Sequence, residues 1–110
     1  MAKEKIVIDQ DIKTAIEKDI EAFNASKLAK NMKYQAAYKS NYIYLFRSDY
    51  PGEDFSPICR LTYRGDLQNM DFAIYKYSSE TYSPSEWMFP GSDLVDGTVT
   101  GAMKAGMKAY

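Results

Sequence analysis

The sequence contains no histidine among its 110 residues. Without an imidazole, the chain cannot build a Ser-His-Asp or Cys-His catalytic centre, a His-Glu-x-x-His zinc site or a histidine pH switch. It has a single cysteine, so no disulfide can form within the chain. These two shortages remove the commonest hydrolytic and metal chemistries and are typical of a protein from a reducing compartment.

Long apolar runs are also lacking. The run Ile6-Val7-Ile8 is too short for the core of a secretory signal. No segment approaches the roughly 20 apolar residues of a membrane-spanning helix. The net charge is −1 and no basic stripe is present, which does not fit a nucleic-acid-binding protein. We expect a cytoplasmic protein with neither a membrane nor a nucleic acid as its partner.

Aromatic residues are abundant. They make up 15% of the chain, and ten of them are tyrosines. Hydrophobic residues account for 45% and charged residues for 26%, proportions that are ordinary for a globular protein. The length fits one domain over residues 1–110, large enough to fold around its own core.

Residues 9–31 have the pattern of an amphipathic helix. Ile12, Ile16, Ile20 and Phe23 recur at helical spacing, and the positions between them are mostly charged or polar. No proline or glycine interrupts the segment. The pattern predicts a long N-terminal helix that buries these four side chains.

Residues 32–77 read as four strands with short connections, over 32–38, 42–47, 58–63 and 71–77. These segments are rich in aromatic and β-branched residues, and turn-forming residues separate them. Short connections between successive strands favour an antiparallel meander. In the third strand, alternation predicts Cys59 and Leu61 on one face and Ile58, Arg60 and Thr62 on the other.

The last third of the chain predicts a capped turn and a second helix. Ser83 and Glu86 form a capping-box pattern with Pro84 at the first helical position, which indicates a helical turn over 84–88. Residues 98–110 read as a helix with a stripe of small residues, which predicts close packing on an aromatic surface. The fold class is therefore α+β: an N-terminal helix on a four-stranded antiparallel meander, a short capped turn and a C-terminal helix.

The side chains that could act in catalysis or bind a metal also have structural explanations. Cys59 lies on the apolar strand face without a nearby base, so we expect it in the core. The carboxylates of Asp49, Glu53 and Asp54, with Asp66 and Asp71, could hold a cation or act in acid–base chemistry, but such residues beside turns are usually solvated. We expect no catalytic residue, no metal and no cofactor.

The candidate binding residues are aromatic side chains and one arginine: Arg60, Tyr75, Tyr77, Trp87 and Phe89. One sheet face suits several occupants. It is predicted to bear Arg60, Thr62, Tyr75 and Tyr77, and to be extended by Tyr42 and Tyr44 or by Gln35 and Ala37. It can form a dimer interface, lie under the C-terminal segment, or stack a planar ligand or single-stranded RNA. Trp87 and Phe89 either plug the core or form a binding loop.

Three stretches carry a resemblance. Tyr44-Leu45-Phe46, Pro57-Ile58-Cys59-Arg60-Leu61-Thr62-Tyr63 and Ile74-Tyr75, which span about the central third of the chain, resemble small bacterial domain families of unknown function. The resemblance implies an α+β bacterial protein and supplies no active site.

These observations lead to two functional hypotheses. The first is a non-catalytic interaction module that self-associates as a homodimer. The alternative is a small-ligand-binding protein or a small enzyme, with a pocket between the Trp87 loop and an aromatic sheet face. The mass of the protein in solution and a deep pocket beside Trp87 distinguish the two.

Overall fold

The structure is a computed structural model that describes residues 8–26, 31–50, 52–85 and 88–110. Five strands form one antiparallel sheet in the order β1-β2-β3-β4-β5, and two helices accompany it. The elements are α1 (Gln10–Asn24), β1 (Lys33–Lys39), β2 (Tyr42–Ser48), β3 (Ser56–Thr62), β4 (Asp71–Lys76), β5 (Thr81–Ser83), a 3-10 turn (Ser92–Leu94) and α2 (Val99–Ala109). The α+β class and the meander are confirmed.

The N-terminal helix is shorter than its sequence pattern predicts. Asp9 caps it by accepting a hydrogen bond from the N–H of Ile12 at 3.0 Å. Ile16, Ile20 and Phe23 are buried as predicted, whereas Ile12 is only partly buried.

α1 ends at Asn24 rather than near residue 31 because side chains divert the backbone. The hydroxyl of Ser26 donates to the carbonyl of Phe23 at 2.6 Å, which competes with the next helical bond. The amide of Asn24 accepts from the N–H of Tyr34 at 2.8 Å and donates to its carbonyl at 3.0 Å. These bonds tie the helix end to β1.

The sheet has five strands where the sequence predicts four. β5 pairs with β4, with Tyr82 opposite Tyr75, and it occupies the segment expected to lead into a helical turn. The Tyr82 ring contacts the rings of Tyr44 and Tyr75 at 5.4 and 5.0 Å, so ring packing holds this short strand. Residues 84–85 form a non-helical turn, and Glu86 and Trp87 lie outside the described residues. The predicted helical turn is thus wrong where it can be compared.

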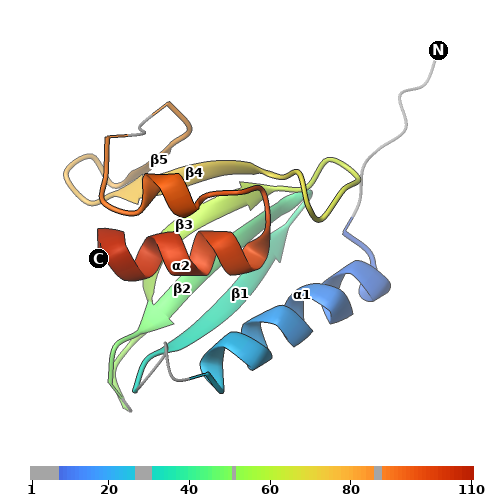
Figure 1. Cartoon of the computed structure of the whole chain (residues 1–110), viewed down its shortest axis with the longest axis horizontal. Coiled ribbons are helices and arrows are strands. Elements are labelled where there is room, and N and C mark those ends of the chain that lie inside the picture. The colour runs from blue at the N-terminus through green and yellow to red at the C-terminus, as the bar shows by residue number, and fades with distance from the viewer. Residues whose placement is uncertain (1–7, 27–30, 51, 86–87) are drawn as a thin grey trace.

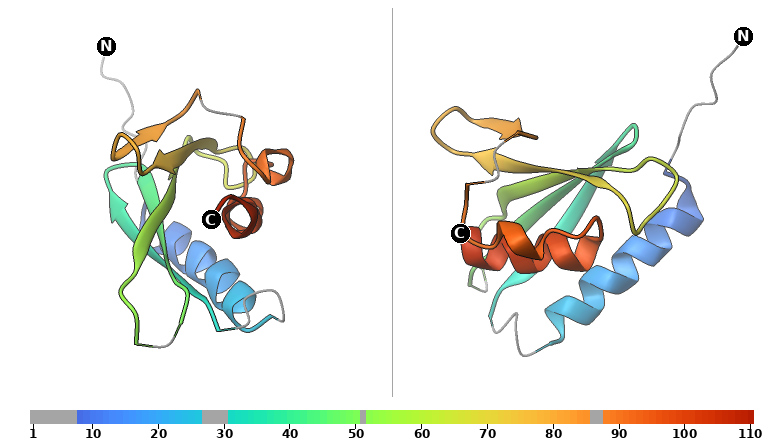
Figure 2. Two further views of the ribbon diagram at one scale, coloured as in Figure 1. Left: turned by 90° about the vertical axis from the view of Figure 1, so that its left-hand side faces the viewer. Right: turned by 45° about the horizontal axis from the view of Figure 1, so that its top comes forward.

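Both helices lie against the same face of the sheet, which we call the covered face (Figure 1; Figure 2). From the sheet it contributes Ile43, Leu45 and Leu61, which are fully buried. Met103 of α2 and Ile16 of α1 are fully buried as well. The core therefore lies between the sheet and the two helices. Among the described segments, no helix combines the length and the apolar character needed to cross a bilayer.

A bulge changes which side Ile58 faces. The pairing of β2 with β3 shifts register between Leu45 and Phe46, where Cys59 pairs with Leu45 but Pro57 pairs with Phe46. Ile58 is the extra residue, and its side chain is buried rather than on the face of Arg60 as predicted. Proline lacks a ladder N–H, and bulges are among the few places where a sheet accommodates it.

The C-terminal helix packs closely, as its small residues predict. Thr98 caps it by accepting from the N–H of Gly101 at 3.0 Å. A Cβ added at Gly106 would lie 2.5 Å from the hydroxyl of Tyr34 and 2.6 Å from Cγ2 of Ile58. The aromatic surface under α2 is therefore Tyr34 on the covered face, and α2 does not lie over the opposite face.

Candidate functional site

One face of the sheet carries neither helix, and we call it the open face (Figure 2). Strand registry defines its side chains, because residues paired across an antiparallel sheet point to the same side. Tyr44 pairs with Ala37 and Arg60, Arg60 pairs with Ala73, and Tyr75 pairs with Tyr82. The open face consists of Lys33, Gln35, Ala37, Lys39, Tyr42, Tyr44, Phe46, Arg60, Thr62, Asp71, Ala73, Tyr75 and Tyr82.

A chain of four tyrosines crosses the open face. Ring centroids are 6.1 Å apart between Tyr42 and Tyr44, 5.4 Å between Tyr44 and Tyr82, and 5.0 Å between Tyr82 and Tyr75. The last two contacts are edge-to-face, a favourable geometry for aromatic rings. Within the described part of the chain, none of these four hydroxyls has a hydrogen-bond partner. The rings are thus fixed by one another while their polar ends stay available.

Arg60 lies among these rings. Its guanidinium carbon is 4.6 Å from the ring centroid of Tyr42 and 5.4 Å from that of Tyr82, so the cation packs against two aromatic rings. Its Nε is buried and lacks a hydrogen-bond partner among the described residues. No carboxylate in the described segments pairs with Arg60.

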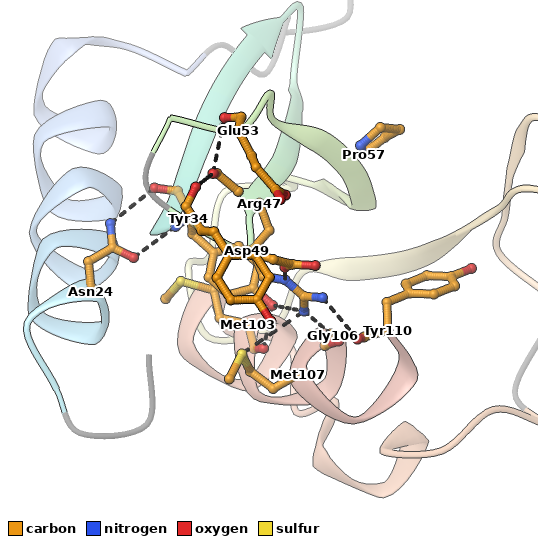
Figure 3. Close-up of polar contacts among 12 residues, drawn as sticks. Asn24, Tyr34, Arg47, Asp49, Glu53, Pro57, Met103, Gly106, Met107 and Tyr110 are labelled. Carbon is orange, nitrogen blue, oxygen red and sulfur yellow. Dashed lines mark hydrogen bonds and ion pairs between the residues drawn. The ribbon is translucent and has the colours of Figure 1, made fainter. Parts of the chain in front are cut away.

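Arg47 provides the contrast on the covered face (Figure 3). Its Nε donates to Asp49 at 2.7 Å, and its two terminal nitrogens donate to the carbonyls of Gly106 and Tyr110, both at 2.9 Å. The Tyr34 hydroxyl beside it donates to the carbonyl of Met103 at 2.8 Å, and burial raises the pKa of this phenol. Arg47 therefore holds the end of α2 against the sheet, where a cation suits the partial negative charge of a helix C-terminus.

The predicted site residues do not all meet. Arg60 and Tyr75 share the open face. Tyr77 follows β4, stacks edge-to-face on Tyr75 at 4.8 Å and donates its hydroxyl to the carbonyl of Pro57 at 2.6 Å. Phe89 stacks on Phe72 at 5.8 Å, which places it on the covered side. Trp87 lies outside the described residues.

A hollow of about 330 Å³ opens near the end of α2. Ile74 and Tyr77 line one side of it, Met88 and Phe89 a second, and Tyr110 a third. The sequence predicts a pocket between the Trp87 loop and an aromatic sheet face, whereas this hollow is lined by β4, residues 88–89 and the end of α2.

The reactive groups are dispersed. Cys59 is fully buried, and burial raises the pKa of its thiol, so a thiolate is disfavoured. Asp49 and Glu53 precede β3, while Asp66 and Asp71 follow it, so the two carboxylate groups lie at opposite ends of that strand. Within the described segments no group of three or more Cys, Asp or Glu side chains is placed to hold a metal.

Tyr82 and Arg47 were not among the site residues predicted from the sequence. Tyr82 was assigned to the approach to a helix, although its spacing from Tyr75 across a Ser-Ser-Glu turn is compatible with a hairpin. Burial, the largest cause, raises the pKa of Tyr82 to about 12, so this phenol keeps its proton at neutral pH. Arg47 ends an apolar strand, and nothing in its local sequence reveals that the helix end returns to it.

Comparisons with protein-family models, with curated proteins and with solved structures give no match for this chain.

Proposed function

We propose that the protein is a non-catalytic interaction module that binds another protein chain through its open face. The observation that carries the proposal is the combination of Arg60 with four tyrosines whose hydroxyls have no partner in the described structure. Tyrosine and arginine are the residue types most enriched at the energetic centres of protein interfaces. Rings that are already packed lose little conformational freedom when a partner binds.

The chemistry of the chain supports binding over catalysis. The sequence has no histidine, and the single thiol is buried with a raised pKa. Histidine and an accessible thiolate are among the commonest groups in acid–base and nucleophilic mechanisms. The open face offers instead hydroxyls and a guanidinium, which bind but do not readily exchange protons at neutral pH.

Self-association as a homodimer stays the prediction of the sequence, and charge sets a condition on it. A two-fold contact across the open face brings Lys33, Lys39 or Arg60 next to its own copy only where that residue lies close to the axis. Such a dimer needs an offset that keeps these cations apart, because like charges in an interface are costly. An unlike partner is free of this condition.

Native mass spectrometry of the protein purified from its own host tests the proposal. We expect the wild-type chain to retain a second protein mass, its own or another. The Tyr44→Ser/Tyr75→Ser variant should lose it, whereas Tyr50→Ser, which removes an exposed loop tyrosine, should keep it. A wild-type chain that carries no other protein, or a double variant that still binds, would contradict the proposal.

The hollow beside Tyr77 and Tyr110 supports a second candidate function, the binding of a small molecule. Its volume of about 330 Å³ falls at the lower end of the range of ligand pockets. In the same spectra, this function predicts a retained mass of small-molecule size that Tyr77→Ala abolishes and Tyr44→Ser/Tyr75→Ser does not.

A further inference from the structure

Within the described residues, Arg60 differs from the other two arginines in having no carboxylate partner. Arg47 pairs with Asp49, and Arg64 pairs with Asp71. Arg60 instead packs on the rings of Tyr42 and Tyr82, at 4.6 and 5.4 Å. A half-buried cation without a counter-ion is costly unless a ligand supplies one.

The geometry determines which part of Arg60 a ligand can reach. Nε is buried and lies out of reach of solvent, so a side-on contact through this atom is closed. The two terminal amino groups have no hydrogen-bond partner in the described structure and are not buried. Two parallel N–H donors in a plane match the two oxygens of a carboxylate.

Charge indicates the partner. The open face carries the cations Lys33, Lys39 and Arg60 and a single carboxylate, Asp71, which pairs with Arg64. α1, against the other face, has four carboxylates and two lysines. The open face therefore carries an excess of positive charge on a chain whose net charge is −1, and it complements an acidic segment.

Nucleic acid and a second copy fit this surface less well. Base stacking needs free aromatic faces. Arg60 already covers the rings of Tyr42 and Tyr82, and the other tyrosines pack edge-to-face. A second copy whose two-fold axis passes near Arg60 would bring the two guanidinium groups together, which is costly.

We propose that the open face binds an acidic segment of another protein, and that Arg60 holds one carboxylate of that segment end-on through its two terminal amino groups. The rings of Tyr42 and Tyr82 hold the guanidinium in place. This inference rests on the proposed function and names the chemistry of the partner.

The side-chain Nε–H signals of the three arginines allow a direct test by nuclear magnetic resonance, because their environments differ. The full chain is titrated with N-acetyl-tetraglutamate amide, and with the matched tetraglutamine peptide as the uncharged control. We expect the Glu peptide to move the Arg60 signal and the backbone amides of the open face. The buried Arg47 signal should stay in place, and the Gln peptide should move none of these signals.

Variants distinguish the contribution of the planar pair of guanidinium donors from that of the positive charge. Arg60→Lys keeps the charge but loses the planar pair of donors, and it should weaken Glu-peptide binding about tenfold or more. Arg64→Lys is the matched control, because it makes the same exchange at an exposed arginine, and it should change binding by less than about threefold, since exposed ion pairs contribute little. The amide spectra of the variants show that they are folded.

The outcomes are distinct. An Arg60 signal that does not move at millimolar Glu peptide, or an Arg60→Lys variant that binds equally well, overturns the inference about Arg60. A stronger shift of the open face with tetrauridylate than with the Glu peptide overturns it in favour of nucleic acid. The proposed function stands or falls separately, on whether Tyr44→Ser/Tyr75→Ser loses the native protein partner.

Discussion

Arg47 and Arg60 occupy neighbouring strands of one sheet, yet they meet opposite conditions. On the covered face, Arg47 is buried and each of its nitrogens donates a hydrogen bond to Asp49 or to a carbonyl of the C-terminal helix. On the open face, Arg60 has aromatic neighbours and a buried Nε that no group in the described part of the chain bonds. A cation whose hydrogen-bond donors are all satisfied stabilises the fold, whereas one with unsatisfied donors is available to bind a ligand.

The largest expected difference between the two faces is in access to reagents. Cys59 on the covered face should react with a thiol reagent only when the protein unfolds. A cysteine at Ala37, exposed on the open face, should react more than about 1000-fold faster in a Cys59→Ala background, because burial limits reaction to rare opening. Labelling rates at neutral pH, measured by mass spectrometry, check this. Equal rates would mean that the covered face opens readily.

Replacing each arginine by methionine sharpens the comparison. Arg47→Met removes the donors to Asp49, Gly106 and Tyr110, and we expect it to lower the free energy of unfolding by about 3 kcal/mol or more. Arg60→Met loses cation–π contacts but also removes the unpartnered Nε, so its cost should stay within about 1 kcal/mol. Urea titrations measure both values. If Arg60→Met proves the costlier change, the open face is structural.

The close approach of α2 gives a smaller effect on the covered face. Gly106→Ala places a methyl group within 2.6 Å of Tyr34 and Ile58, so overpacking should cost about 1–3 kcal/mol. Lys104→Ala, at an exposed position of the same helix, should change stability by less than about 0.5 kcal/mol. Thermal unfolding of the two variants compares them. An unchanged melting temperature for Gly106→Ala would show that α2 is free to move away from the sheet.

Periodicity predicted both helices and four of the five strands, because burial on one side imposes a repeat on the sequence. It placed Cys59 and Leu61 inside and Arg60 outside correctly. It failed where a single residue breaks the repeat: the bulge at Ile58 follows from how β3 pairs with β2, which the alternation within β3 alone does not contain. β5 was missed because three residues are too few to show alternation.

Composition predicted that the candidate site is aromatic but not which residues form it. The abundance of tyrosine pointed to an aromatic sheet face, and Arg60 and Tyr75 indeed share one. That Phe89 stacks on Phe72 on the other side depends on how the loop returns to the helices, a long-range property. Arg47 illustrates the same limit, because its partners at Gly106 and Tyr110 are 59 and 63 residues away in the sequence.

The side-chain amide of Asn24 blocks part of the hydrogen-bonding edge of β1. In β1 every second residue directs its backbone N–H and C=O away from β2, and these groups are a template for adding strands from other molecules. Asn24 bonds to both groups of Tyr34, which leaves Ala36 and Tyr38 as the outward-bonding residues between Lys33 and Lys39. A stretch this short, with a lysine beyond each end, resists the growth of intermolecular sheets. We therefore expect the molecule to expose the tyrosines of its open face without β1 acting as a template for polymers.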